Sequence, residues 1–424
     1  MSALITRRRI ARLGSFASAQ VAVQLIGFGS GIVMVRYMEQ AQYGYYTLAV
    51  SMVSIANILT DLGLATAVLA IGGRFATQRG TLGHLVADAN ALHRRLAWLS
   101  FGVMIPCFVF LLLRQHAAPW QVAALTVLIV ATAALNVRAG LALSIARLLG
   151  HVSLQQKLDL AINVTKLCLL MAATWIALDA TVACLVNLGA AAGYWVVLSR
   201  HLDKHIELPV LAAGVHAQAL RAHVWKQAPN SVYFVLSSQI ALWLIGVFGS
   251  AERVAEVGAL GRLGALFTVV GAVSAALVLP YFARSHRPAD VRSGFVAINL
   301  FYAAVMASLV ALAVVFPAPI LWVLGGAYGA LQSELVWMIA ASTLSAWGGT
   351  IYGIGCARSW VMPVSLSVST GLLATAVAAS LVDVSSVRGS FMINAATGLV
   401  GMVAACGYFA WNLRRHAAQA AAPA

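Results

Sequence analysis

Long apolar runs separated by short polar connections follow one another along almost the whole chain. A run of roughly 20 apolar residues is long enough to cross a bilayer as one helix. We predict twelve such spans, at residues 13–36, 43–71, 95–113, 120–145, 156–178, 180–199, 226–248, 257–281, 294–315, 333–355, 361–381 and 391–412. Hydrophobic residues make up 62% of the 424 positions and charged residues only 9%, whereas soluble chains carry roughly a quarter charged residues. The pattern predicts an all-α integral membrane protein.

The basic residues gather in alternate connections between these spans. The chain has 27 Lys and Arg against 12 Asp and Glu, and most of the basic residues fall on the side that holds both termini. Since Lys and Arg are enriched in cytoplasmic loops, we predict a multi-pass protein with both termini in the cytoplasm. This bias explains the net charge of +15, so we expect no nucleic-acid partner.

The longest polar connection, "RHLDKHIELPVLAAGVHAQALRAH", divides the spans into six plus six. We predict an N-terminal lobe at 1–199, a cytoplasmic linker at 200–225, a C-terminal lobe at 226–412 and a cytoplasmic tail at 413–424. The halves echo each other at one offset, Arg12 with Lys226 and Gly44 with Gly258. Internal repeats are typical of transporters with a substrate site between the repeats. Lobes of like orientation imply a pseudo-two-fold axis along the membrane normal.

Ionisable residues inside the spans are the first candidates for function, because each costs roughly 2.5–3.5 kcal/mol to insert and so normally faces a cavity or a partner. Asp159, Asn163 and Lys166 are spaced by four and then three residues, which places them on one face of a helix. Lys166 and Arg138 are lone cations within spans. We therefore expect both cations to face a cavity, with Asp159 as a candidate for ion coupling.

Two further polar stripes occur in the first half of the chain. They are Gln20, Gln24, Gly27 and Gly31 in the first span, and Thr47, Ser51, Ser54 and Asp61 in the second. With the 156–178 stripe they predict a hydrated cavity lined by three helices, although such residues also serve as close-packing positions between helices. Arg36 and Arg262 fall near the predicted outer ends of their spans, where they either act on substrate or reach toward headgroups. Asp61 fits a cap or an ion pair.

Several chemistries have no motif in this chain. Without a Gly-Lys dipeptide there is no phosphate-binding loop for ATP, and no long outer loop could hold an extramembrane active site. The five cysteines lie in apolar runs and fit packing positions. His201 and His205 have the i, i+4 spacing of metal ligands, but they lie in a basic connection. We expect a transporter with no catalytic residues, metal or cofactor.

Four motifs in order, over nearly the whole chain, carry a resemblance to a known family. They are "RYMEQAQYGYYTLA" with "DLGLATAV", "LIGVFGSAERVAEVGALGRL", "LPYFAR" and "VLGGAYGALQSELVWMIA". The chain resembles the polysaccharide transporter branch, the O-antigen and exopolysaccharide flippases, of the multidrug/oligosaccharidyl-lipid/polysaccharide exporter superfamily. Where that family often has an acidic residue in the seventh helix, this chain has Gln239. Lipid II flippases, a related group, commonly carry two additional helices.

The resemblance implies a V-shaped transporter in the bacterial inner membrane. It would move a polyprenyl-diphosphate-linked oligosaccharide to the periplasmic leaflet, for lipopolysaccharide or exopolysaccharide synthesis. Its partners would be membrane lipids, a glycan polymerase and a chain-length regulator. Lys166 and Arg138 would hold the diphosphate or an acidic sugar. Gln20, Gln24, Ser51 and Asn163 would bind sugar hydroxyls, and Arg36 and Arg262 would aid release. The alternatives are a cation-coupled drug antiporter of the same superfamily and a non-transporting scaffold of a glycan assembly complex.

Overall fold

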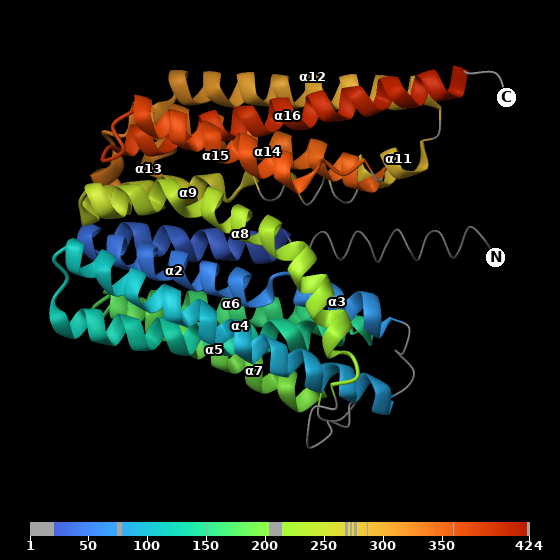
Figure 1. Ribbon diagram of the computed structural model, residues 1–424. Coiled ribbons are helices and arrows are strands. Elements are labelled where there is room, and N and C mark those ends of the chain that lie inside the picture. Colours follow the sequence, from blue (N-terminus) through green and yellow to red (C-terminus); the bar gives the residue numbers. More distant parts are fainter. Residues whose placement is uncertain are drawn as a thin grey trace, which may run out of the picture. The chain divides into compact units, whose positions relative to one another are not determined.

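The computed structural model describes residues 21–73, 79–149, 151–202, 214–267, 270–271, 274, 278–285, 287–358 and 360–421. All regular elements within these ranges are helices (Figure 1). Residue contacts divide the chain into two compact units, Met1–Leu236 and Ser237–Ala424. We call them unit 1 and unit 2 and describe each by itself.

Unit 1 is a bundle built around one central helix. Its helices are Val21–Tyr37, α2 (Gln40–Asp61), α3 (Leu64–Gly72), α4 (Arg79–Arg114), α5 (Pro119–Leu148), α6 (Val152–Ala173), α7 (Ala180–Leu202) and the first part of α8 (Ala217–Phe248). The central helix, α5, starts on Pro119, whose fixed φ suits the first turn of a helix. It packs chiefly on α7 and also contacts α2, α3 and α4.

Unit 2 is organised around two long helices packed on each other, α14 and α16. Its elements are the rest of α8, α9 (Ala251–Gly264), α11 (Leu279–Arg284), α12 (Pro288–Val315), α13 (Pro317–Trp322), the 3₁₀ turn η2 (Gly326–Tyr328), α14 (Gln332–Ala357), α15 (Val364–Leu381) and α16 (Val387–Ala421). α12 packs on α14, and α15 packs on α16. Only a small share of α12 is buried, so most of its surface is left for lipid.

The helices confirm the predicted all-α membrane fold. Among the described residues, seven helices are long and apolar enough to span a membrane, or eight if Ala217–Tyr233 and Ser237–Phe248 of α8 form one span. Each of the twelve predicted spans contains described helix, while the count of twelve membrane crossings stays a prediction.

The predicted span at 43–71 is broken into two helices, α2 and α3. Leu62 and Gly63 adopt positive φ angles of 39° and 86°, which end α2. The Asp61 carboxylate accepts hydrogen bonds from the backbone N–H groups of Gly63 at 3.2 Å and Ala65 at 2.9 Å. A Cβ on Gly63 would lie 3.0 Å from the Cβ of Gln227. Asp61 therefore caps α3, and the break needs a glycine.

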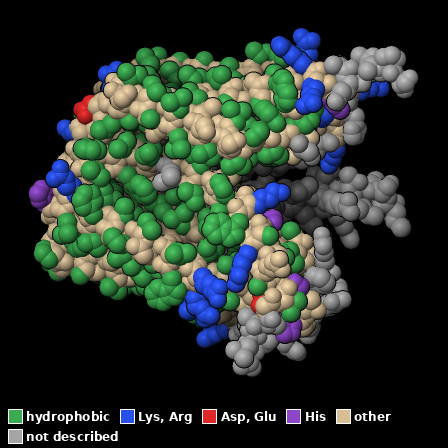
Figure 2. All heavy atoms as spheres, in the orientation of Figure 1, with side chains coloured by type: hydrophobic (Ala, Val, Ile, Leu, Met, Phe, Trp, Pro, Cys, Tyr) green, Lys and Arg blue, Asp and Glu red, His purple; other side chains and the backbone are tan. Residues whose placement is uncertain are grey.

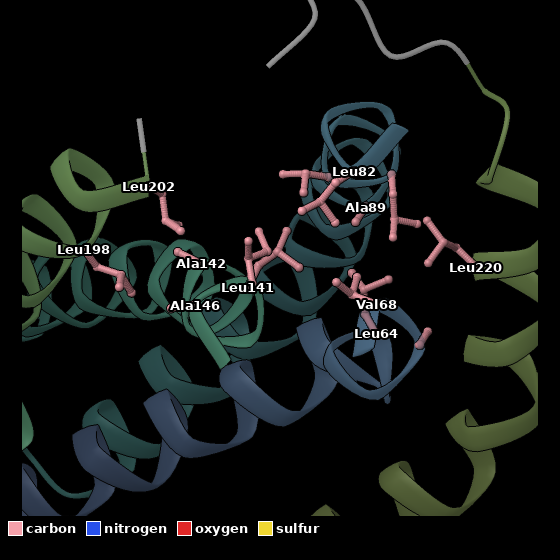
Figure 3. Close-up of a cluster of buried hydrophobic side chains, with 14 of the residues drawn as sticks. Leu64, Val68, Leu82, Ala89, Leu141, Ala142, Ala146, Leu198, Leu202 and Leu220 are labelled. Carbon is pink, nitrogen blue, oxygen red and sulfur yellow. The ribbon is translucent and has the colours of Figure 1, made fainter. Parts of the chain in front are cut away.

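The first part of α8 is packed into unit 1. Figure 3 shows a buried apolar cluster that includes Leu64 and Val68 of α3, Leu82 of α4 and Leu220 of α8. Asp88 of α4 is only 3% exposed. Its carboxylate accepts hydrogen bonds from the backbone N–H groups of two residues just before α8, Gly214 at 2.8 Å and His216 at 2.9 Å. These contacts fix the entry into α8 on unit 1.

The second part of α8 belongs to unit 2. There the Ser390 hydroxyl of α16 donates a hydrogen bond to the Ala241 carbonyl at 3.3 Å. The chain thus passes from unit 1 to unit 2 inside α8, between Leu236 and Ser237, while the lobe boundaries and the linker at 200–225 stay a prediction.

Candidate functional site

One face of α6 carries the main candidate site, which we call the polar seam: Gln156, Asp159, Asn163 and Lys166. The four side chains are half-buried, and their spacing of three, four and three residues keeps them on one side of the helix. Leu170, the next residue on that side, is fully buried. The seam therefore faces the interior of unit 1 rather than open surface.

Asp159 is held by neighbouring polar groups. The Tyr194 hydroxyl on α7 hydrogen-bonds its carboxylate, and the Gln155 amide donates to it at 3.4 Å. Arg147 in turn donates from Nε to the Gln155 carbonyl oxygen at 2.9 Å. The Asp159 carboxylate thus already has two hydrogen-bond donors. Through Gln155 it is also linked to the Arg147 guanidinium.

Two groups of the seam lack such partners. The Lys166 ammonium makes no hydrogen bond or ion pair within the described part of the chain, and its field reaches Cys184 on α7. The amide nitrogen of Gln156 is buried and likewise has no acceptor among the described residues. A half-buried cation and a buried donor without partners form an arrangement suited to an anion or to hydroxyl groups, because unpaired buried polar groups are costly.

The first helix approaches the seam through a glycine. A Cβ on Gly27 would lie 4.0 Å from the side-chain oxygen of Asn163, while the Asn163 amide nitrogen donates to the Asp159 carbonyl at 2.7 Å. Gln24, one turn before Gly27, is half-buried. The structure thus brings the stripes of the first and fifth predicted spans together, whereas Gln20 lies outside the described residues.

Most side chains of the polar stripe on α2 form hydrogen bonds with backbone carbonyls of the same helix. Thr47, Ser51 and Ser54 donate their hydroxyls to the carbonyls of Tyr43, Leu48 and Val50 at 2.8–2.9 Å. Ser51 is also buried, at 6% exposed, which favours a packing role for it over sugar binding.

On the same α2 face the structure adds a residue that the sequence analysis missed. The side-chain oxygen of Asn57 is buried without a donor among the described residues. Its spacing, three residues after Ser54 and four before Asp61, is a signal that could have found it.

The predicted cations are not gathered into one cluster. Arg138 is exposed on the side of α5 that also carries Trp120 and Val127, which are 60% and 68% exposed, and no described contact joins it to Lys166. Arg36 is exposed at the end of its helix. In unit 2, Arg262 lies in the last turn of α9, which begins at Ala251 rather than at the predicted 257. Arg262 is therefore roughly 16 Å along α9 from its start, deeper than expected.

Unit 2 contains a polar cluster of another kind, which we call the Tyr302 network. The Tyr302 hydroxyl, on a side chain only 1% exposed, bonds Ser274 at 3.1 Å and Thr350 at 2.6 Å. Beside it, the Trp347 indole nitrogen donates to Asn299 at 2.9 Å, and the Trp347 ring stacks on Tyr302. The network ties α12 to α14 with neutral groups. Because its groups are neutral, no intramembrane charge in the sequence marks it.

Of the two histidines with metal-ligand spacing, the structure describes His201, which contacts another histidine. His201 places Nε2 at 2.9 Å from Nδ1 of His151, with the rings edge to face, and His205 lies outside the described residues. The described residues contain no group of three or more His, Cys, Asp or Glu side chains that could hold a metal ion. The two imidazoles hold the end of α7 next to the start of α6.

Solved transporters share this fold over nearly the whole chain. A MATE family multidrug resistance transporter of the MOP superfamily, in an inward-facing conformation, matches with a TM-score of 0.67 and 14% identity, covering 96% of this chain and 100% of its own. The lipid II flippase MurJ, in an inward closed conformation, matches with a TM-score of 0.71 and 10% identity, covering 94% of this chain and 87% of its own. A MOP superfamily transporter from Pyrococcus furiosus is described as having a binding pocket of reverse polarity. It matches with a TM-score of 0.63 and 15% identity, covering 95% of this chain and 94% of its own.

The sequence matches no family model and no curated protein. Taken together, the structural matches show that the chain shares the fold of these transporters, while its place in the polysaccharide branch stays a prediction.

Proposed function

We propose that this chain is a flippase that moves a polyprenyl-diphosphate-linked oligosaccharide from the cytoplasmic to the periplasmic leaflet of a bacterial inner membrane. One observation carries the proposal: Lys166 is a half-buried cation, without an ion pair in the described part of the chain, on a face lined by amide side chains. A drug-binding site for cations would have little use for it. A diphosphate, in contrast, needs a cationic partner away from water.

In this proposal the polar seam binds the headgroup of the substrate. The Lys166 ammonium would donate to diphosphate oxygens, and Gln156, Asn163 and Gln24 would hydrogen-bond sugar hydroxyls. Gln20, outside the described residues, would bind sugar hydroxyls as well. The prenyl tail would stay in lipid. Unit 1 and unit 2 would rock to open the site to one side and then the other, as in transporters built from repeats.

The cations outside the seam would act at other stages. Arg138, exposed on α5, would meet the diphosphate or an acidic sugar on its way in, and Arg36 and Arg262 would aid release. A glycan polymerase and a chain-length regulator would receive the product. The likeness of fold to a protein described as a lipid II flippase supports a lipid-linked substrate.

The test is a comparison of two lysines on one helix. Cells lacking the gene would receive wild type, Lys166→Ala or Lys157→Ala at equal membrane levels. Lys157 is exposed on α6, so its removal takes away the same charge outside the seam. We expect Lys166→Ala to accumulate lipid-linked oligosaccharide about tenfold above wild type, since a hydrogen bond to a charged group contributes roughly 1.5–3 kcal/mol. Lys157→Ala should behave as wild type, and full rescue by Lys166→Ala would reject the proposal.

A second candidate, a cation-coupled drug antiporter, rests on Asp159 and on the likeness of fold to multidrug transporters. A carboxylate between Tyr194 and Gln155 could take up and release a proton during transport. In that case cells lacking the gene would keep normal surface glycan and become sensitive to cationic drugs. Wild type would restore resistance, and Asp159→Asn would not.

A further inference from the structure

A groove runs between α12 and α16 in unit 2, and no residue of the polar seam or the Tyr302 network lines it. Its volume is about 890 Å³, within the roughly 300–1,000 Å³ typical of small-molecule sites. On α12 its lining extends from Ala289 to Leu300 at helical spacing, and on α16 it takes Leu413 and Arg414. It thus follows α12 for roughly 16 Å.

One end of the groove is basic. Arg292 and Arg414 line it from the two helices, and no carboxylate is among the lining residues. Both guanidinium groups are exposed, and neither has a hydrogen bond or ion pair with another described residue. Figure 2 shows Lys and Arg side chains gathered at this end of unit 2, where α12 begins and α16 ends. Two unpaired cations facing one groove are complementary to an anionic group.

The rest of the groove is apolar and lies on the exposed surface of unit 2. Val296 and Leu300 are 48% and 65% exposed, and Phe295, Ala297 and Leu413 complete the walls. α12 is only slightly buried along its length. In a membrane such a surface is covered by acyl chains. An occupant therefore needs an anionic head at one end and an apolar chain of at least roughly 16 Å.

We infer that this groove is a binding site for an anionic phospholipid of the leaflet in which α12 begins. The lipid phosphate lies between Arg292 and Arg414, the Ser293 hydroxyl is within the same lining, and one acyl chain follows Val296 toward Leu300. Basic pockets between membrane helices are known to hold anionic headgroups on the cytoplasmic side, which is the side predicted for both arginines. The bound lipid would reinforce the contact between α12 and α16, where the Phe295 ring stacks on Phe409 with centroids 4.5 Å apart.

The test uses purified full-length protein in non-ionic detergent, with dioleoyl-phosphatidylglycerol as the probe and native mass spectrometry to count bound lipid. Wild type should bind it in preference to dioleoyl-phosphatidylcholine. Arg292→Gln and Arg414→Gln should each weaken binding about fivefold, the factor expected for one basic residue near an anionic lipid surface. Ala297→Trp, on an exposed position, should weaken binding by filling the groove while leaving both charges in place.

Arg415→Gln is the matched control. Arg415 is adjacent in sequence, stacks over Trp411 at 5.3 Å and is not among the lining residues, so its loss should leave lipid binding unchanged. Equal losses in Arg414→Gln and Arg415→Gln would show a general charge effect and overturn the site. Unchanged binding in Ala297→Trp would do so too, as would full displacement of the lipid by inorganic phosphate. Displacement by polyprenyl diphosphate at lower concentration would instead make the groove a substrate site.

Discussion

The polar seam of unit 1 and the Tyr302 network of unit 2 are both half-buried or buried polar clusters between helices, yet their groups are satisfied to different degrees. In the seam, Lys166 and Gln156 have no partners among the described residues. In the network, the Tyr302 hydroxyl has two partners and the Trp347 indole has one. Satisfied buried networks rigidify a fold, whereas unsatisfied groups reduce stability. Proteins keep such groups mainly at functional sites, so the contrast supports the proposed ligand site at the polar seam and favours a packing role for the Tyr302 network.

Removing the charge of the seam should have the largest effect, and on activity rather than on stability. In Lys166→Met we expect transport to fall at least about tenfold, while the thermal unfolding midpoint stays equal or rises, because a half-buried charge without a partner is lost. Transport per folded molecule and unfolding in detergent would be measured together. A lower midpoint with normal transport would mean that the Lys166 ammonium only stabilises the fold. The polar seam would then not differ in role from the Tyr302 network.

Tyr302→Phe should show the opposite behaviour. Without the hydroxyl, Ser274 and Thr350 lose their shared partner, at a cost of about 1–3 kcal/mol in the free energy of unfolding. Transport per folded molecule should be unchanged. Tyr408→Phe removes the same atom from a half-buried tyrosine of α16 whose hydroxyl has no described hydrogen bond, so it should be neutral. Equal effects of the two variants would show that the network adds nothing.

A third test asks whether the units also differ in backbone. Gly63 of unit 1 has a φ of 86° and lies against Gln227, so Gly63→Ala should cost about 1–2 kcal/mol from the left-handed conformation alone. Gly261 of unit 2 is helical with open space at its Cβ, so Gly261→Ala should be neutral or stabilise by up to about 1 kcal/mol. Urea unfolding in detergent measures both. Equal losses of unfolding free energy in the two variants would show that the break between α2 and α3 does not need a glycine.

The smallest effect should come from the exposed loop between α15 and α16. Hydrogen bonds from the Ser385 hydroxyl at 2.7 Å and its backbone N–H at 2.9 Å hold the pKa of Asp383 below its usual 3.8. A lowered pKa in the folded state favours folding above pH 3.8, and this contribution is lost as the pH falls through the folded-state value. Thermal midpoints at pH 5 and pH 3 should therefore differ slightly less in Asp383→Asn than in wild type. An unchanged difference would show that these bonds do not persist in solution.

Much of the fold could be predicted because apolar length alone defines a membrane helix. α5, at 119–148, differs from the predicted 120–145 by only a few residues. The prediction was wrong for the start of α4, which begins at Arg79 rather than at 95. The residues between are mixed, but Leu82 and Leu85 pack into the core of unit 1. Tertiary packing extends a helix where hydropathy has already fallen.

The candidate site was less predictable, because spacing along one helix cannot say what lies across from it. The face of Asp159, Asn163 and Lys166 could be predicted, since it needs only helical periodicity. The partners of Asp88 could not, because Gly214 and His216 come from a distant part of the chain and offer only backbone groups. Ser51 followed the same periodicity as the seam, yet it turned out to be buried.

The path of α8 has a consequence for the order in which the protein can be made. Leu220 and Val224 complete the apolar cluster around Leu64 and Leu82, but they are synthesised only after the first six predicted spans. A nascent chain that ends near residue 199 would leave that cluster open to lipid or water. The earlier helices can therefore reach their final packing only after Leu220 and Val224 have left the ribosome. A fragment cut at the predicted lobe boundary would leave this cluster incomplete after insertion and would be a good substrate for quality-control proteases.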